Sequence, residues 1–561
     1  MEIIIYFILF VLAVTIYSII NKNKQKKLLI GKLKDEWGKI PEKEYSSDKL
    51  ESLKYFYLSQ YNDYIDIDDI TWNDLDMDEI FLRINNTQSS LGEEYLYALL
   101  RKPIFSSEEL EERNRLIEYF QSHEDDRLKI QVNLNNVGRL RNISAFEYIN
   151  RLAMQEATSN IPHYLMALAL ILSIVSIFIN PSIGIGLSLF VLAFNIVSHF
   201  KYKAQIENYI ALIAFSLRLL DSIEHLVKHS VPELDKYNAQ LASDLKAFKG
   251  YKRGSYIVVA RNVSGNLLEA MLDYYRMFTH HDLIKYNSML NFFKNNKDTV
   301  NRIFETVGFI DSMIAIASYR HMLDYYSLPN LSKAKTNPEL IITDVYHPLI
   351  LKPVTNSISS TSSTLLTGSN ASGKSTFIKS LAVNAILSQT IYTSLSREYK
   401  ASYFIIYSSM ALKDNILSQE SYFIVEIKSL KRIIDKAGGE YPMLCFVDEV
   451  LRGTNTLERI AASSRILASL AKKNTLCFAA THDIELTYIL EKYFTNYHFR
   501  ERVDEKQVLF DYKLYKGRAM TKNAIKLLNL LGYSEDIIND ANEAVDLYMN
   551  TGEWSIIKEM E

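Results

Sequence analysis

The chain contains little cysteine, with only Cys445 and Cys477 among its 561 residues. Two thiols cannot make the disulfide framework of a small secreted domain, and no spacing of cysteine and histidine typical of a zinc site is present. Both cysteines lie within short apolar runs. We therefore expect two free thiols on core strands and a reducing, cytoplasmic environment around them.

The chain also lacks an excess of charge, because 63 lysine and arginine residues balance 66 aspartate and glutamate residues, for a net charge of −3. A nucleic-acid-binding domain usually carries a basic surface, and this balance gives no such footprint. Proline is scarce, with 10 residues, and neither a low-complexity linker nor an internal repeat is found. The length leaves room for two or three domains.

Apolar positions that recur every three or four residues predict a mostly helical first half. Helices are expected over 51–60, 107–130, 204–230, 263–295 and 297–327. A polar stretch, 330–338, is the expected domain boundary. Two polar clusters are interpreted as solvated surface, since the first has no zinc spacing and the second lacks the sharp-turn glycine of a calcium loop. They are His280-His281-Asp282 and the acidic residues Asp63, Asp66, Asp68, Asp69, Asp74, Asp76, Asp78 and Glu79.

Long uncharged runs indicate membrane-spanning helices. Residues 3–20 carry no charge and would span about 27 Å as a helix, close to the thickness of a hydrocarbon core. The alternative is a cleaved signal peptide, but no basic segment precedes the run. Lys22, Lys24, Lys26 and Lys27 follow it, and the positive-inside rule then places the amino terminus outside the cell.

A second apolar block runs over 164–200 and pauses at Asn180-Pro181-Ser182. Two spans joined by a proline turn predict a transmembrane hairpin, with both ends in the cytoplasm beside basic residues. The alternative is a buried helical pair in a soluble core. Gly184-Ile185-Gly186 is not interpreted as a dinucleotide fingerprint, because no strand precedes it and the third glycine is missing.

Residues 367–376 have the sequence Thr-Gly-Ser-Asn-Ala-Ser-Gly-Lys-Ser-Thr, which fits G-x-x-x-x-G-K-[ST] between an apolar run and a helical pattern. This setting predicts a phosphate-binding loop whose backbone N–H groups point at nucleotide phosphates. Lys374 is expected to contact the β- and γ-phosphates, and Ser375 to bind Mg²⁺. The predicted nucleotide-binding residues are Gly368, Ser369, Asn370, Ala371, Ser372, Gly373, Lys374, Ser375 and Thr376.

Two further apolar runs end on polar residues. Leu444–Val447 is followed by Asp448 and Glu449, and Leu476–Ala480 is followed, after one residue, by His482. Ligands bind at the carboxyl ends of strands in open α/β sheets, so these side chains are expected at the phosphates. Asp448 is predicted to hold Mg²⁺, and Glu449 to polarise the attacking water. The alternatives are a solvated acidic turn and a structural histidine.

These motifs together resemble the ATPase domain of the MutS family, whose relatives include the ABC ATPases. The segments that carry the resemblance are Thr367–Thr376, Asp448-Glu449-Val450-Leu451-Arg452-Gly453-Thr454-Asn455-Thr456, Ala480-Thr481-His482-Asp483-Ile484-Glu485-Leu486, Asn496-Tyr497-His498, Tyr512-Lys513-Leu514 and Gly517. Ser369 and Ala371 depart from the family's Pro and Met. The resemblance is dense over 341–545 and weaker over 71–103 and 300–350.

The resemblance implies a nucleotide site that two subunits complete together. Glu449 and His482 are then the expected catalytic residues, with His482 sensing the γ-phosphate. Ser421 and the segment Thr454, Asn455, Thr456 are expected to contact the partner's nucleotide, although Gln419 stands where the family favours glycine.

The expected fold is multidomain, with a C-terminal α/β P-loop (ABC-like) ATPase, a central all-α helical core and lever region, and three transmembrane helices. The expected parts are a membrane anchor (1–21), a cytoplasmic helical region (22–160), a transmembrane hairpin (161–203), a lever region (204–330), the ATPase (331–545) and a tail (546–561). The Phe-x-Glu wedge of mismatch-reading relatives occurs only within the ATPase, at Phe499-Arg500-Glu501, where it is interpreted as coincidental.

The sequence therefore predicts a membrane-anchored ATP hydrolase of MutS type that uses ATP and Mg²⁺ and dimerises with itself to switch its helical arms. Its ATPase is expected in the cytoplasm of a multi-pass membrane protein, with the lipid bilayer and an unknown client protein as further partners. One alternative is a membrane-tethered DNA repair or recombination factor, with DNA binding that is weak and not mismatch-specific. Another is an ABC-like transport motor, which three spans per chain disfavour.

Overall fold

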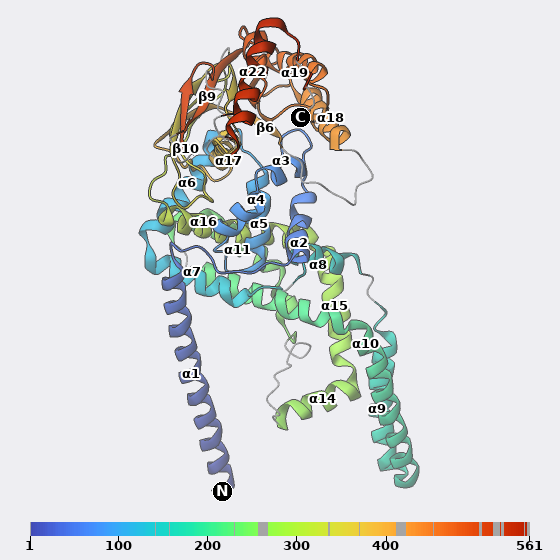
Figure 1. Cartoon of the computed structure of the whole chain (residues 1–561). Helices are drawn as coiled ribbons and strands as arrows, with labels where there is room; N and C mark the ends of the chain where they lie inside the picture. The colour runs from blue at the N-terminus through green and yellow to red at the C-terminus, as the bar shows by residue number, and fades with distance from the viewer. Residues whose placement is uncertain are drawn as a thin grey trace. The chain divides into compact units, whose positions relative to one another are not determined.

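The computed structural model divides the chain into two compact units, which are described separately (Figure 1). Unit 1 comprises residues 1–61, 81–99 and 112–322, and unit 2 comprises 62–80, 100–111 and 323–561. The structure describes residues 2–557 except 141, 156–157, 229–230, 256–266, 335–336, 370, 411–421, 453, 504–507, 520–524, 526–527, 529–531 and 555.

Unit 1 is helical throughout its described residues, as the apolar periodicity predicts. Helix α16 forms its centre, with most side chains from Val300 to Arg320 buried. Asp311 on this helix is buried and accepts hydrogen bonds from the backbone N–H groups of Gln88 and Ser89, which stabilises the start of α5. The helices lying wholly or partly in this unit are α1 (Glu2–Glu36), α2 (Ser47–Leu58), α4 (Met77–Ile84), α5 (Ser90–Arg101), α6 (Ser107–Ser122), α7 (Glu124–Val137), α8 (Ala145–Met154), α9 (Ile161–Ile179), α10 (Pro181–Lys228), η1 (Pro232–Leu234), α11 (Asp235–Ala247), α12 (Lys249–Lys252), α14 (Leu267–Thr279), α15 (His281–Asn295) and α16 (Lys297–Met322).

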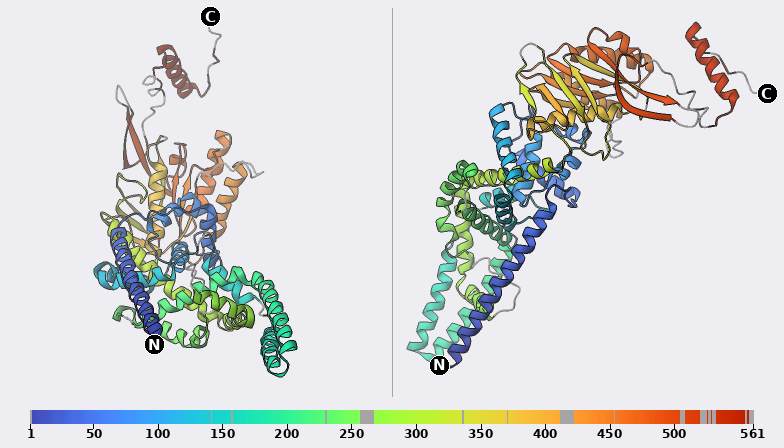
Figure 2. Two further views of the ribbon diagram at one scale, coloured as in Figure 1. Left: turned by 90° about the horizontal axis from the view of Figure 1, so that it is seen from below. Right: turned by 90° about the vertical axis from the view of Figure 1, so that its left-hand side faces the viewer.

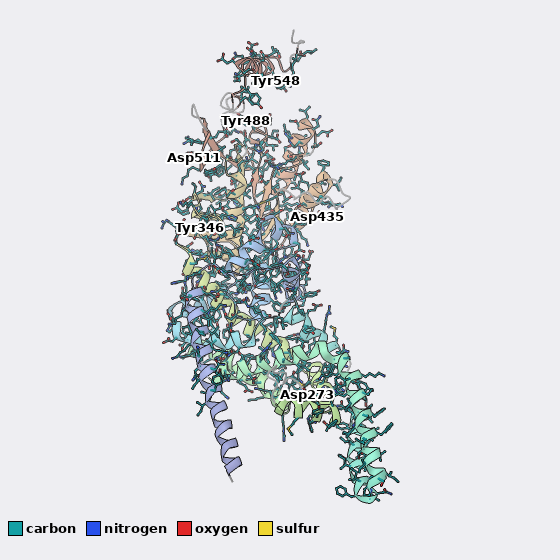
Figure 3. The ribbon with its side chains drawn as sticks, turned by 60° about the horizontal axis from the view of Figure 1, so that its bottom comes forward. Asp273, Tyr346, Asp435, Tyr488, Asp511 and Tyr548 are labelled. Carbon is teal, nitrogen blue, oxygen red and sulfur yellow. The ribbon has the colours of Figure 1, made fainter. Side chains whose placement is uncertain are left out.

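Helices α9 and α10 form the predicted hairpin and lie side by side in both views of Figure 2. A Cβ atom at Gly184 would lie 2.4 Å from the backbone nitrogen of Ile177, so the close approach of the two helices requires glycine there. Most of their apolar side chains are not covered by protein and stand out along the hairpin in Figure 3. This exposure contradicts a buried helical pair in a soluble core.

Among the described residues, two helices and not three are long and apolar enough to cross a membrane: Ile161–Ile179 and Pro181–Ala204. The second continues as α10 to Lys228, well past the predicted end of the span at 203. The third predicted span, 3–20, lies in the first half of α1, but the side chains of 2–15 and of residue 18 lie outside the described residues.

The prediction that His280-His281-Asp282 is solvated surface is wrong, because His280 and Asp282 are buried. His280 Nδ1 lies 3.0 Å from Nδ1 of His163 on α9, and Asp282 lies 2.9 Å from Nε2 of His199 on α10. These polar groups join the hairpin to the start of α15. Their partners lie 83 and 117 residues away, so local polarity gave no sign of the contact.

Unit 2 contains a six-stranded sheet of order β10-β9-β4-β8-β7-β6 and a four-stranded sheet of order β1-β5-β2-β3. In the larger sheet every described pairing is parallel except β10 with β9. The first strand, β1, lies within the segment predicted as a polar boundary. The strands are β1 (Asn330–Ser332), β2 (Leu340–Val345), β3 (Asn356–Ser360), β4 (Ser363–Thr367), β5 (Glu398–Ser402), β6 (Ile405–Ser409), β7 (Met443–Asp448), β8 (Thr475–Ala480), β9 (Phe494–Val503) and β10 (Val508–Lys516).

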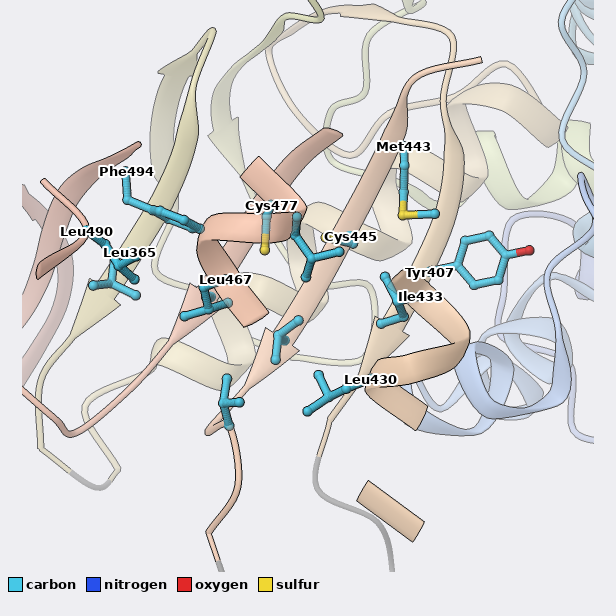
Figure 4. Close-up of a cluster of buried hydrophobic side chains, with 14 of the residues drawn as sticks. Leu365, Tyr407, Leu430, Ile433, Met443, Cys445, Leu467, Cys477, Leu490 and Phe494 are labelled. Carbon is cyan, nitrogen blue, oxygen red and sulfur yellow. The ribbon is translucent and has the colours of Figure 1, made fainter. Parts of the chain in front are cut away.

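The larger sheet packs against helices over buried apolar side chains. In Figure 4, Cys445 and Cys477 lie on neighbouring strands of this cluster, and Leu467 packs beside them from α19. Both cysteines are buried free thiols, as predicted. The helices lying wholly in unit 2 are α3 (Asp69–Asp74), α17 (Lys374–Thr390), α18 (Tyr422–Lys436), α19 (Thr456–Ala471), α20 (Leu486–Ile489) and α22 (Glu535–Thr551).

The acidic segment around α3 is only in part the solvated surface that the sequence suggested, because Asp63, Asp69 and Glu79 are exposed but Asp66 and Asp74 are buried. Asp74 is buried and accepts hydrogen bonds from Ser408 Oγ, at 2.7 Å, and from the Met410 N–H, at 2.9 Å, beside the end of β6. Other acids of the segment form ion pairs with basic side chains, namely Asp63 with Lys436, Asp68 with Arg432, Asp69 with Arg101 and Asp76 with Lys379. The segment 62–80, predicted as part of the helical region, therefore packs within unit 2.

Candidate nucleotide-binding and catalytic site

Three parallel strands end together at one edge of the larger sheet. Leu366 on β4 and Asp448 on β7 both stand opposite Ala480 on β8. Two hydrogen bonds continue this alignment past the strand ends, from the Thr481 N–H to the Leu366 carbonyl (2.9 Å) and from the Glu449 N–H to the Ala480 carbonyl (3.0 Å). The register thus brings together the loop after β4, the acids after β7 and the histidine after β8.

The loop after β4 has the backbone that its glycines predict. Gly368 has φ +148°, and a Cβ there would lie 2.8 Å from the carbonyl oxygen of Phe499, so a side chain would be excluded. Gly373, with φ +106°, immediately precedes α17. Ala371 also has a positive φ, of 62°. Asn370 lies outside the described residues.

Lys374 opens α17 and folds back over the loop, where its Nζ donates hydrogen bonds of 2.8 Å to the carbonyl oxygens of Gly368 and Ser369. Burial lowers the pKa of Lys374, while the nearby carboxylates of Glu449 and Asp448 act in the opposite direction. The Ser369 hydroxyl is hydrogen-bonded to Glu501 on β9. A buried cation at a helix amino terminus favours a bound anion.

Glu449 lies where its carboxylate meets two basic side chains. Its Oε1 is 2.7 Å from Nε2 of His482, and its other oxygen accepts a hydrogen bond from Arg452. Burial by itself would raise the pKa of Glu449, but the hydrogen bonds from His482 and Arg452 outweigh it and lower the pKa to about 2. Glu449 also has φ +54°, an uncommon conformation for a non-glycine residue. The carboxylate is therefore ionised and held in one orientation.

The residues predicted to bind Mg²⁺ have a suitable donor set. Asp448 Oδ1 is buried without a hydrogen-bond partner among the described residues, and Ser375 is exposed on the wall of the adjoining cavity. Ser372 Oγ is likewise buried without a partner. Carboxylate and hydroxyl oxygens are the ligand type that Mg²⁺ prefers, so these residues fit the ion.

A cavity of about 380 Å³ lies beside the loop and is large enough for a small-molecule ligand. Loop residues, Glu449 and Arg452 form one part of its wall. Its other lining residues include His347, Ile350, Val354 and Phe377, which no sequence motif singled out. They also include Phe499 and Tyr512, which were noted in the sequence but given no role at the nucleotide. His347, Ile350 and Val354 lie between β2 and β3, and Phe377 lies on α17, so no local pattern marks them as neighbours of the loop after β4.

The residues predicted to contact a partner subunit are only partly described. Asn455 caps α19, with its Oδ1 accepting a hydrogen bond of 3.0 Å from the Leu457 N–H, and Thr454 Oγ1 lies 3.4 Å from Glu458. Asn455 and Thr456 are exposed. Ser421 lies outside the described residues, and α18 begins directly after it.

Comparison with known proteins agrees with this geometry. The family model of MutS domain V, an ATPase domain, matches residues 364–548. The DNA mismatch repair protein MutS of Thermotoga petrophila is 25% identical over an alignment that covers 88% of this chain and 67% of the relative. MutS protein homolog 4 of Homo sapiens is 28% identical over 43% of this chain and 27% of the relative. These matches support a member of the MutS family, with a helix-rich N-terminal part and a C-terminal α/β domain that matches the model of MutS domain V.

Proposed function

We propose that this chain is a membrane-anchored ATPase that binds and hydrolyses ATP at composite sites of a homodimer and thereby switches its helical arms. The observation that carries the proposal is the convergence of Lys374, Glu449 and His482 at one sheet edge, beside a cavity of about 380 Å³. A positive charge at the phosphates, a carboxylate held in place and a group that contacts the γ-phosphate are what hydrolysis of a nucleoside triphosphate requires.

In the proposed reaction the phosphates lie against the loop backbone and the start of α17. Lys374 turns from the carbonyl oxygens of Gly368 and Ser369 to the β- and γ-phosphates. Glu449 accepts a hydrogen bond from the attacking water and aligns it with the γ-phosphorus, while His482 holds Glu449 and contacts the γ-phosphate. Ser375 and Asp448 would hold Mg²⁺, which offsets phosphate charge when it is bound.

The base and sugar of the nucleotide are proposed to occupy the apolar part of the cavity. Phe499 and Tyr512 offer aromatic rings there, and Ile350 and Val354 offer aliphatic contacts. Sequence motifs specify only the phosphate end of such a site. The cavity therefore supports a nucleotide in preference to a free phosphate ion.

Membrane anchoring is supported by the uncovered apolar surface of the hairpin. In the most apolar stretch of each helix, only 11% of α9 and 22% of α10 is buried within the protein. Apolar patches of this extent are rare on monomeric soluble proteins and stable in hydrocarbon. We propose that the hairpin spans the bilayer with unit 2 in the cytoplasm, and that the first half of α1 provides a further span.

Dimerisation is supported by the exposed segment at the start of α19. Leu457, which is 79% exposed, lies next to the predicted partner-contacting residues Asn455 and Thr456. An exposed leucine beside two hydrogen-bonding side chains suits a surface that a second subunit covers when ATP is bound.

Sedimentation of the detergent-solubilised full chain tests the proposal. The Glu449→Gln variant with ATP and Mg²⁺ should sediment as a dimer at micromolar concentration, because ATP is retained and joins both subunits. Lys374→Ala under the same conditions should remain monomeric. A Glu449→Gln variant that binds ATP and stays monomeric would contradict the composite site.

DNA binding is a second candidate function, favoured by the name of the bacterial relatives, which are DNA mismatch repair proteins. The net charge of −3 opposes it, because phosphate contacts need a basic surface. We therefore propose that any DNA binding by this chain is weak and does not discriminate a mismatch.

A further inference from the structure

A second cavity, of about 700 Å³, opens at the edge of unit 2 where the central strands begin. Ser363, the first residue of β4, and Thr475, the first residue of β8, line it, and Pro442 precedes β7 there. The nucleotide site lies at the carboxyl ends of these same parallel strands. The two cavities are thus on opposite edges of the sheet and share no lining residue.

Two hydroxyl groups in this second cavity are buried without hydrogen-bond partners. Thr475 is 7% exposed and Tyr403 is 5% exposed, and neither Thr475 Oγ1 nor the Tyr403 hydroxyl bonds to a described protein atom. Most buried hydroxyls in proteins are paired, because an unpaired one loses its hydration without compensation. By contrast, the neighbouring Ser363 hydroxyl accepts a hydrogen bond of 3.0 Å from the Cys477 N–H. Thr475 and Tyr403 therefore each have a hydrogen-bonding group that no described residue uses.

The wall of the cavity is positively charged. Lys333, Lys472 and Lys492 line it against a single acid, Glu440, and none of the three lysines forms an ion pair with a described residue. Lys472 Nζ lies 5.2 Å from the ring centroid of Tyr493, and both residues line the cavity. The carboxyl end of α19, at Ala471, adds a partial negative charge, which is smaller than the summed positive charge of the three lysines.

The cavity is also lined by aromatic side chains. Tyr441 and Tyr403 both line the cavity, and both pack against Phe105, at ring-centroid distances of 4.1 and 6.0 Å. Tyrosine rings fixed in this way offer apolar surface to a ligand at little cost in conformational entropy. The lining of the cavity thus combines lysine ammonium groups, unpaired hydroxyl groups and tyrosine rings.

We propose that this cavity is a second ligand site, which takes a phosphorylated small molecule of mononucleotide size. The phosphate would lie against Lys472 and Lys492, since lysine ammonium groups bind phosphate as point charges. Thr475 and Tyr403 would hydrogen-bond to the sugar, and the planar group would lie against the tyrosine rings. Strands β4, β7 and β8 begin at this cavity and end at the nucleotide site. Binding of a metabolite at this cavity could therefore change the rate of ATP hydrolysis at the other end of the same strands.

The test uses the detergent-solubilised full chain with Lys374→Ala, which removes the phosphate loop lysine from the first site. Equilibrium dialysis then measures binding of AMP, ribose 5-phosphate and inorganic phosphate. We expect AMP to bind more tightly than inorganic phosphate, and the added double change Lys472→Gln and Lys492→Gln to weaken AMP binding about tenfold or more. Lys431→Gln is the matched control, since this exposed lysine pairs with Asp435 and does not line the cavity.

Thr475→Val separates ligand binding from a structural role. The valine keeps the shape of threonine and removes a hydroxyl that has no protein partner, so the melting temperature of the ligand-free chain should be unchanged or raised. AMP binding should nevertheless weaken severalfold. The proposal is overturned if AMP does not bind the Lys374→Ala chain at millimolar concentration, if the lysine double change leaves binding intact, if all three probes bind equally, or if Thr475→Val lowers the ligand-free melting temperature.

Discussion

Replacing Glu449 by glutamine should stop ATP hydrolysis while leaving ATP binding in place. Glutamine has the size of glutamate and can keep one acceptor oxygen near His482, but it carries no charge. The two hydrogen bonds that Glu449 accepts, from His482 and Arg452, both have an ionised acceptor. Only the group that aligns and polarises water is therefore removed, because Lys374 and the loop backbone are unchanged.

The expected magnitudes follow from these contacts. A positioned general base contributes about 10²- to 10⁴-fold to a rate, so kcat should fall by that factor, or by about 3 to 5 kcal/mol of transition-state stabilisation. Each hydrogen bond loses about 1 kcal/mol when its acceptor becomes neutral, so the ligand-free variant should be less stable by about 2 kcal/mol.

Phosphate release at saturating ATP measures the rate, and a fluorescent ATP analogue measures binding. The matched control is Glu491→Gln, an exposed acid paired with Arg518 outside the site, which should keep its full rate. Hydrolysis by Glu449→Gln above one tenth of the unaltered rate would show that another group orients the water. A parallel loss of binding and hydrolysis would equally contradict the role given to Glu449.

Four further experiments have expected outcomes. Lys374→Ala should lose ATP binding itself by titration, since it removes the cation at the phosphates; retained binding would contradict that contact. A cysteine at Ser182, in the hairpin turn, should react with an impermeant thiol reagent on intact cells and one at Ser288 should not; labelling at both or neither would contradict the topology. His347 is buried, which lowers its pKa to about 4. As the pH falls from 6.5 to 4, the unfolded chain therefore binds a proton at this residue that the folded chain does not bind. Thermal unfolding should show that up to about 3 kcal/mol of stability is lost over this pH range, and that the His347→Asn variant does not show this loss. Competition binding of the full chain to matched and mismatched duplexes should show no preference and steep loss with salt; a salt-resistant preference for the mismatch would favour the repair function.

Local patterns predicted the backbone conformation of the loop after β4 well, because that conformation is set within ten residues. Glycines at 368 and 373 have the positive φ values that the motif requires, and α17 begins directly after them. The strands β7 and β8 were likewise indicated by apolar runs that end on polar residues. In both cases the information lies in neighbouring residues, so periodicity and turn chemistry suffice.

The errors lie where a polar residue finds its partner far along the chain. Asp76 forms an ion pair with Lys379, 303 residues away, and Asp68 with Arg432, 364 residues away. Without those partners an acidic run has the composition of a solvated surface. The same reasoning failed for Asp282, whose partner His199 lies in an apolar block that was interpreted only as a membrane span.

Convergence of the candidate catalytic groups depends on strand register, which no single motif specifies. Side chains alternate between the two faces of a strand, so a slip of β7 by one residue would exchange the environments of Asp448 and Glu449. The register is held by buried apolar pairs along β7 and β8, including Cys445 with Cys477, and by the hydrogen bond from the Glu449 N–H to Ala480. Apolar residues that take no part in chemistry thus determine which of the two acids meets His482.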